Sequence, residues 1–213
     1  MIDEHSFKAI YSYCESVSDS PSDILHELYR ETHLKTLAPR MASGPVQGRF
    51  LSLFSKLVSP TQVLEIGTFT GYATLCIAEG LAENGHIHTI EVNPELNHIS
   101  DKYFRELGVR DQITSHIGDA KTVIGGLYRL FDIVFIDAKK KDYSLYYDLV
   151  IDKVRQGGYI LADNVLWDGK VYAGGKDATT KSLMMFNQRM KDDPRVETSL
   201  LPLRDGLSIM RKK

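Results

Sequence analysis

The sequence predicts an α/β fold: a mostly parallel sheet of seven strands with helices on both faces and an antiparallel hairpin at the C-terminus. From residue 62 onward, short β-rich apolar runs alternate with helical segments, which is typical of a parallel sheet covered on both faces. The last two apolar runs, 195–203 and 206–212, meet at the turn sequence Arg-Asp-Gly, which predicts a closing hairpin.

Five parallel strands and two intervening helices are expected before that hairpin. The helices are expected over 72–85 and 94–108, the second opened by Pro94 near its start. Farther along, Met184, Met185 and Phe186 predict the buried face of a late helix. The five expected strands are 62–67, 86–92, 112–120, 131–138 and 157–165.

The 213 residues suit one domain, 1–213, in which a helical extension over 1–60 precedes an α/β core over 61–213. In the extension, one helix capped by the segment 18–23 is expected, and another that follows 41–48 and ends before Ser59-Pro60. The apolar face of the first helix is predicted from residues spaced three and four apart: Phe7, Ile10, Cys14 and Val17.

Composition and charge set further bounds on location and partners. A net charge of −2 does not favour a polyanion-binding protein, although a local basic patch stays possible. The two cysteines, Cys14 and Cys76, lie far apart and favour free thiols over a disulfide or a metal site. The N-terminus lacks a signal-peptide pattern, and no apolar segment approaches the roughly 18 residues of a membrane span. We therefore expect a cytoplasmic protein without membrane association.

Acidic side chains stand at the ends of all five parallel strands. In such sheets, ligands bind outside the carboxyl ends of the strands. Carboxylates there disfavour a phosphate-rich ligand and favour one that is cationic, rich in hydroxyls or bridged by a divalent metal. Any single acid could instead cap the following helix. The acids are Glu65, Glu91, Asp119, Asp137 and Asp163.

The loop after the first strand discriminates between two adenosine cofactors. Gly67 and Gly71 suggest a dinucleotide-binding turn, and Glu91, 20 residues after Gly71, is spaced to bind a ribose diol. However, Phe69 stands where that turn needs a glycine so that the backbone can approach a pyrophosphate. This favours S-adenosylmethionine (SAM), which has a ribose and a sulfonium charge but no phosphate, over NAD.

A candidate metal site follows the fourth and fifth strands. Asp137, Asp163 and Asn164 offer hard oxygen ligands suited to Mg²⁺, Ca²⁺ or Mn²⁺, although a helix cap and an Asx turn explain them equally well. Lys140 lies three residues after Asp137 and could act as a general base, or belong to a solvated lysine run. Trp167 could line a substrate pocket or simply pack.

In their order and spacing, six segments resemble the metal-dependent, SAM-dependent O-methyltransferases, the family that includes catechol and caffeoyl-CoA O-methyltransferases. The resemblance implies a Rossmann-like class I methyltransferase fold and a homodimer. It also implies methyl transfer to a metal-chelated hydroxyl of a catechol-like or caffeoyl-type small molecule. The segments are 41–51, 63–74, 90–94, 118–120, 135–143 and 162–167.

Carried over by position, the family pattern assigns a role to individual residues. Lys140 and Asp137 would be catalytic, and Asp137, Asp163 and Asn164 would hold the metal. The cofactor-binding set would be Met41, Ser43, Glu65, Gly67, Tyr72, Ala73, Glu91, Asp119, Ala120 and Asp137.

Two positions depart from that pattern. Ala73 stands where the family usually has a serine that helps bind the amino-acid end of the cofactor, so Thr74 or a water could substitute or affinity could be lower. Catechol-specific members also carry an acid just before the final Asp-Gly-Leu, where this chain offers only Asp205 itself. The second departure makes simple catechols doubtful as physiological acceptors.

Three alternatives remain open at this point. Some bacterial relatives methylate a hydroxylated uridine in tRNA, and a rim of lysines could bind such a substrate. An NAD-dependent oxidoreductase and a cofactor-binding module without catalysis are the other two. The lysines are Lys139, Lys140, Lys141, Lys170, Lys176 and Lys181.

Overall fold

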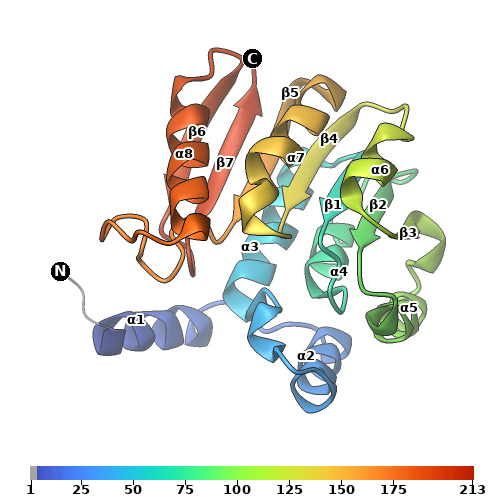
Figure 1. The fold of residues 1–213 in the computed structure, drawn as a ribbon. Coiled ribbons are helices and arrows are strands. Elements are labelled where there is room, and N and C mark those ends of the chain that lie inside the picture. Colours follow the sequence, from blue (N-terminus) through green and yellow to red (C-terminus); the bar gives the residue numbers. More distant parts are fainter. Residues whose placement is uncertain (1–3) are drawn as a thin grey trace.

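A single seven-stranded sheet organises the molecule (Figure 1). The computed structural model describes the backbone of residues 4–213 and the side chains of residues 8–213. The strand order across the sheet is β3-β2-β1-β4-β5-β7-β6. The strands are β1 (Gln62–Ile66), β2 (His86–Glu91), β3 (Ile113–Ile117), β4 (Phe131–Ile136), β5 (Val154–Asp163), β6 (Val196–Leu201) and β7 (Leu207–Lys212).

The first five strands run parallel, and the last two form the predicted antiparallel hairpin. β1 pairs in parallel with both β2 and β4, and these pair in parallel with β3 and β5. β7 lies antiparallel between β5 and β6. The predicted fold class is therefore confirmed, and the carboxyl ends of β1 to β5 share one edge of the sheet.

Helices cover both faces of the sheet. One layer contains α6, α7 and α8, and the opposite layer contains α2, α3, α4 and α5. No helix in the described part of the chain, 4–213, is both long and apolar enough to span a bilayer. The helices are α1 (Glu4–Ser16), α2 (Asp23–Lys35), α3 (Gly44–Val58), α4 (Tyr72–Ala78), α5 (Asn97–Glu106), α6 (Ala120–Gly125), α7 (Tyr143–Val150) and α8 (Ala178–Asp192).

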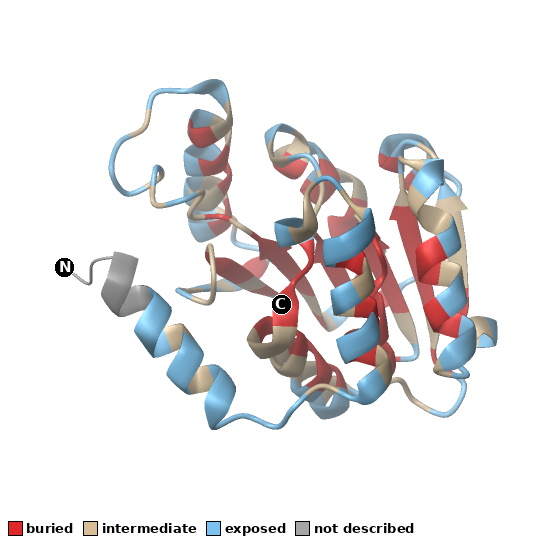
Figure 2. Cartoon of the chain, turned by 90° about the horizontal axis from the view of Figure 1, so that it is seen from below, coloured by how far each residue is buried: buried red, intermediate tan, exposed pale blue. Residues whose placement is uncertain are grey.

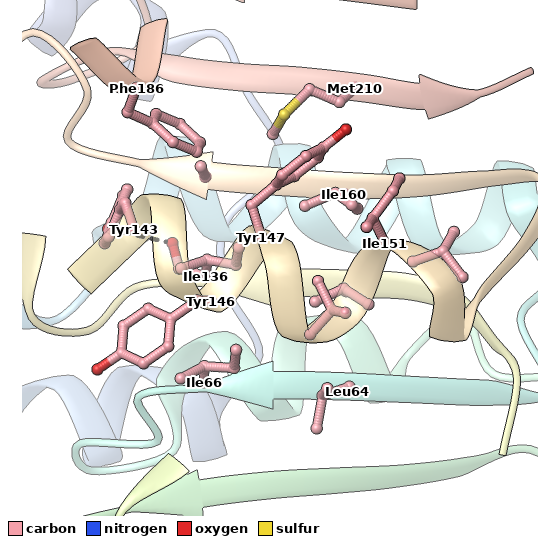
Figure 3. Close-up of a cluster of buried hydrophobic side chains, with 14 of the residues drawn as sticks. Leu64, Ile66, Ile136, Tyr143, Tyr146, Tyr147, Ile151, Ile160, Phe186 and Met210 are labelled. Carbon is pink, nitrogen blue, oxygen red and sulfur yellow. Dashed lines mark hydrogen bonds between the residues drawn. The ribbon is translucent and has the colours of Figure 1, made fainter. Parts of the chain in front are cut away.

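Successive residues of the central strands feed two separate cores. On β1, Leu64 and Ile66 point to the layer of α7, whereas Val63 points to the layer of α3 and α4. Figure 3 shows the first core, where Tyr146 and Tyr147 of α7 lie among residues of the strands and Phe186 of α8. Burial on both sides explains why β1 and β4 read as nearly continuous apolar runs.

Several element boundaries differ from those expected. α4 ends at Ala78 rather than near residue 85. Just beyond it, the chain at Gly80 passes α3 so closely that a Cβ there would lie 2.2 Å from the backbone nitrogen of Lys56. α3 begins at Gly44, with a proline in its first turn. β3 ends at Ile117, so 118–120 form a turn and a helix start instead of strand.

Two predicted apolar helix faces are buried only in part. On α8, Met184 and Met185 are 41% and 71% exposed, and only Phe186 of the three is buried. On α1, Ile10 is exposed and the half-buried positions are Tyr11 and Cys14, and Val17, which follows the helix, is also exposed. Figure 2 shows that most of this helix faces solvent. The side chain of Phe7 lies outside the described residues.

Candidate functional site

The site lies at the carboxyl edge of the parallel strands, where the five predicted acids gather from five separate segments. Glu65 and Glu91 lie near or at the ends of β1 and β2, and Asp163 ends β5. Asp119 and Asp137 follow β3 and β4 within two residues. Parallel pairing explains this convergence, because it places these strand ends side by side.

The loop after β1 is shaped by close approach of the backbone. Gly67 has a φ of 104°, and a Cβ there would lie 2.0 Å from the carbonyl oxygen of Asp137. Gly71 also has a positive φ, and a Cβ there would lie 2.7 Å from the Phe104 ring. Both positions therefore require glycine for steric reasons.

Glu91 holds this loop in place. One of its carboxylate oxygens accepts a hydrogen bond from the Phe69 amide at 2.8 Å, and the other accepts one from the Asn93 amide at 2.8 Å. Phe69 has a φ of 50°, which is uncommon for a residue with a side chain. The carboxylate therefore organises the backbone of the loop after β1 and the turn after β2.

Glu65 is a fully buried carboxyl group with one unsatisfied oxygen. Its Oε2 accepts hydrogen bonds from the hydroxyls of Thr74 and Thr89, whereas its Oε1 has no partner among the described residues. Burial raises the pKa of Glu65 to about 8, and the negative charges of Asp137 and Glu91 add to that effect. A buried acceptor without a donor indicates a place for a cationic or hydrogen-bond-donating ligand group.

Asp137 and Lys140 form an ion pair at the end of β4. The Lys140 Nζ lies 2.6 Å from Asp137 Oδ1 and 2.7 Å from the Tyr143 hydroxyl. That hydroxyl in turn contacts the backbone oxygen of Asp163 at 2.8 Å. Because the Lys140 side chain is only 11% exposed, it is not part of a solvated lysine run.

Of the proposed metal ligands, Asp163 is a buried acid and Asp137 lies near enough to raise its pKa. Asp163 is buried, and its Oδ2 accepts no well-aligned hydrogen bond within the described part of the chain, although the nearby Gln47 side chain favours the ionised carboxylate. Burial raises the pKa of Asp163 to about 6, with a further contribution from the negative charge of Asp137. A cation bound near the Asp163 and Asp137 carboxylates would offset both the cost of burying the Asp163 charge and the repulsion between the two negative charges. Two carboxylates and the Asn164 carboxamide are also the oxygen donors that Mg²⁺ and Ca²⁺ prefer.

The third proposed ligand, Asn164, is an amide and not an acid. Among residues 8–213, no three His, Cys, Asp or Glu side chains gather into a group that could hold a metal. The candidate site therefore depends on Asn164, whose φ of 57° marks a strained position. The backbone amide of Asn164 donates a hydrogen bond to Asp163 Oδ1 at 2.8 Å, which fixes the orientation of that carboxylate.

The other cofactor candidates lie in varied environments. Ser43 and Ala73 are buried, whereas Met41 is largely exposed. Tyr72 packs its ring against α3 at Gly48 and edge-on to Tyr29, so its side chain belongs to the core.

Asp119 and Ala120 follow β3. Asp119 accepts a hydrogen bond from the Lys121 amide at 2.8 Å and thereby caps α6, so the helix-capping alternative holds for this acid. Its side chain is 54% exposed. Ala120 is buried.

The strained loop after β5, which carries Trp167, is bonded to Asp205 in the turn between β6 and β7. Trp167 and Asp168 have φ values of 54° and 50°, and the Asp168 amide donates to Asp205 Oδ1 at 2.6 Å. Trp167 packs partly against the α7 core. Asp205 therefore anchors the backbone that presents Trp167.

Sequence reasoning missed Arg204 and Gln47, which no local motif marks. Arg204 donates to the Arg40 carbonyl at 2.8 Å and to the buried Gln47 side chain at 3.3 Å. Gln47 also helps lower the pKa of Asp163, against the larger effect of burial. These contacts join the C-terminal hairpin to the segment before α3, beside the candidate metal ligands.

Sequence comparison gives the chain's relatives. A model of the O-methyltransferase family matches residues 15–213. A caffeoyl-CoA O-methyltransferase of Medicago sativa is 31% identical, with 96% of this chain and 88% of that protein aligned. The one of Petroselinum crispum is 32% identical, with 96% and 90% aligned.

Solved structures of methyltransferases share this architecture closely. The methyltransferase PaMTH1 of Podospora anserina, bound to SAH (S-adenosylhomocysteine), superposes with a TM-score of 0.92 at 27% identity, covering 100% of this chain and 97% of that one. The O-methyltransferase TomG of Streptomyces achromogenes, in complex with SAM, gives 0.90 at 25% identity, with 100% of both chains covered.

Proposed function

We infer a reaction for this chain from one premise: it belongs to the O-methyltransferase family and is a SAM-dependent O-methyltransferase. This membership decides against the NAD-dependent oxidoreductase and the non-catalytic module. We propose that the acceptor is a catechol-like or caffeoyl-type small molecule whose hydroxyl is held by a divalent metal. The observation that carries the proposal is Asp163, a buried carboxylate with an unpartnered oxygen, as far as the described residues go, next to Asp137 and Lys140.

The cofactor would supply an electrophilic methyl group on a sulfonium. Glu91 would accept hydrogen bonds from the ribose hydroxyls, since its carboxylate already orders the loop around Phe69. Glu65, whose Oε1 bonds to no described residue, would bind the cationic end of the methionine portion. The remaining cofactor contacts proposed by position are Met41, Ser43, Gly67, Tyr72, Ala73, Asp119, Ala120 and Asp137.

A bound Mg²⁺, or another hard divalent cation, would orient the acceptor and favour ionisation of its hydroxyl. Asp137, Asp163 and Asn164 would hold this cation. The Asp163 backbone oxygen accepts a hydrogen bond from the Tyr143 hydroxyl at 2.8 Å, and the backbone amide of Asn164 orients the Asp163 side chain. These residues are therefore ordered before a cation or an acceptor arrives, which lowers the cost of binding.

Lys140 would take the proton from the acceptor hydroxyl as a neutral amine, the form that a cation held by Asp137 would favour over the ammonium of the ion pair. A phenol with a pKa near ~10 costs roughly 4 kcal/mol to ionise at neutral pH, at about 1.4 kcal/mol per pKa unit. A positioned base raises the reaction rate on the order of 10²–10⁴-fold, which lowers the barrier by about 3–5 kcal/mol and is comparable to the cost of ionisation. The contact between Lys140 and Asp137 would keep the amine beside the acceptor oxygen.

Relatives support the class of acceptor. Two aligned proteins above 30% identity are named caffeoyl-CoA O-methyltransferases, and both alignments span nearly the whole chain. Trp167 would form a wall of the acceptor pocket, held by the loop that Asp205 anchors. A homodimer stays a proposal from the family resemblance, and light scattering would test it.

The test is a methyl-transfer screen with catechols, caffeoyl esters and hypomodified tRNA, run with Mg²⁺ and after EDTA treatment. We expect transfer to a caffeoyl or catechol compound that EDTA abolishes and added Mg²⁺ restores. Full activity after EDTA would contradict the metal proposal. Transfer to tRNA alone would favour the alternative acceptor, although Lys139 and Lys140 of the lysine rim are already paired with Asp142 and Asp137.

A further inference from the structure

The surroundings of Glu65 divide its carboxyl group into two unlike halves. Two hydroxyl groups converge on Oε2: that of Thr74 in the first turn of α4 and that of Thr89 on β2, the latter at 2.5 Å. Oε1 is buried and has no partner among the described residues. Glu65, Thr74 and Thr89 are all fully buried, so bulk water does not compete for these bonds.

The donors come from different parts of the fold. Thr74 belongs to the helix that follows the loop, and Thr89 lies on β2 directly opposite Glu65 in the parallel register. A third hydroxyl, that of Thr68 in the loop, lies 2.5 Å from the Thr89 hydroxyl. Strands β1 and β2 and helix α4 are thus joined at a single carboxylate oxygen, and the loop is linked to it only through the Thr89 hydroxyl.

We propose that Thr74 and Thr89 are positioning residues for the cofactor, because they occupy one oxygen of Glu65 and thereby hold its other oxygen for the ammonium group of the methionine portion. SAM carries two cationic groups, but only the ammonium can donate hydrogen bonds, and Oε1 is an acceptor that lacks a donor among residues 8–213. The inference rests on the proposed role of Glu65 in binding the cofactor.

This inference also gives Thr74 a specific role. Thr74 does not replace the serine hydroxyl missing at Ala73 by binding the cofactor directly, since its own hydroxyl is already committed to Glu65. Thr74 instead acts through the orientation of the glutamate. No described basic side chain bonds to Glu65, so the two hydroxyls are the donors that fix its carboxyl group.

The experiment measures binding of two ligands by calorimetry, without metal or acceptor. SAH contains the ammonium group, whereas 5′-methylthioadenosine has the same nucleoside but lacks the amino-acid portion. We expect Thr74→Val and Thr89→Val each to weaken SAH binding about tenfold or more, because a hydrogen bond to a charged group is lost. Binding of methylthioadenosine should change less than about twofold, because that ligand does not reach Glu65.

Matched variants separate positioning from folding. Thr74→Ser and Thr89→Ser keep the hydroxyls and should restore most of the SAH affinity. Thr32→Val removes an equally buried hydroxyl that bonds to Thr70 at 2.9 Å rather than to Glu65, and it should affect neither ligand. Melting temperatures of all variants identify any that do not fold, in which case the serine variants and the remaining valine variant carry the test.

The outcomes are distinct. Equal losses for SAH and methylthioadenosine would show that the threonines act only through the fold and would overturn the inference. Unchanged SAH affinity in both valine variants would overturn it as well. Failure of the unmodified protein to bind either SAH or SAM would instead contradict the role of Glu65 and the cofactor site as a whole.

Discussion

Lys140 and Asp137 form an ion pair 2.6 Å long at the end of β4, and the Tyr143 hydroxyl joins this pair to the backbone of Asp163. One segment thus connects the proposed base to both proposed carboxylate ligands. Lys140 begins the 3₁₀ turn Lys140–Asp142, and Tyr143 begins α7 directly after it. A short 3₁₀ turn therefore sets the distance between the proposed base and the proposed metal ligands.

Replacing Lys140 with methionine should lower kcat by about 10²–10⁴-fold, the usual contribution of a positioned base. Methionine keeps most of the side-chain volume, and Lys140 does not contact the proposed ribose or adenine residues. The dissociation constant for SAH should therefore stay within about threefold. Lys139→Met, which alters a largely exposed neighbour paired with Asp142, should retain activity. Equal activity of the two variants would remove Lys140 from the mechanism.

Asp163→Asn should abolish methyl transfer while leaving SAH binding intact. The same change should not destabilise the metal-free protein. Because the pKa of Asp163 is raised from 3.8 to about 6, the folded state loses stability as pH rises through that window. Above pH 6 the unmodified protein carries a penalty of up to about 3 kcal/mol that the asparagine variant lacks.

Thermal unfolding at pH 8 with and without Mg²⁺ checks the Asp163 prediction. Added Mg²⁺ should raise the melting temperature of the unmodified protein and not that of Asp163→Asn. Asp148→Asn, which alters an exposed aspartate paired with Arg189, is the control and should keep the Mg²⁺ response. An unchanged Mg²⁺ response in Asp163→Asn would argue against Asp163 as a ligand.

The affinity for SAH should rise with pH up to about 8. The pKa of Glu65 is raised from 4.5 to about 8, so below pH 8 the ligand-free protein holds a proton on this carboxyl group. A ligand ammonium favours the ionised form, so binding releases that proton, and affinity falls by as much as about tenfold per pH unit of acidification. Calorimetry in buffers of different ionisation enthalpy measures the released proton. Glu65→Gln should bind more weakly and show a flatter pH dependence.

Gly67→Ala should be strongly destabilising, by several kcal/mol, because the new Cβ would lie 2.0 Å from the Asp137 carbonyl and the backbone has a positive φ. Gly174→Ala is the matched control, since Gly174 also has a positive φ but no described neighbour would lie within 4 Å of an added Cβ. Its cost should be only about 1–2 kcal/mol, from backbone strain alone. Denaturant midpoints measure both, and equal costs would mean that the Gly67 contact relaxes freely.

The sequence by itself determined the fold class and the edge of the sheet at which the candidate site was expected. The alternation of apolar runs and helices predicted the parallel sheet, because a strand buried on both faces must be apolar at nearly every position. Acids at Glu65, Glu91 and Asp163 could then be placed at one edge, because parallel strands end side by side. Helix faces were less predictable: Met184 and Met185 are apolar but exposed, since burial depends on whether a neighbouring element covers them.

Only the tertiary structure decided which side chains meet. Thr74 and Thr89 bond to one oxygen of Glu65, and Arg204 bonds to Arg40 and Gln47. These contacts follow from the packing of segments that are separate in the sequence. Periodicity reports which face a residue occupies and carries no information about its partner across the fold. One oxygen each of Glu65 and Asp163 has no hydrogen-bond partner among the described residues, and these two oxygens support the proposed site. They can be identified only when the positions of the surrounding donors are known.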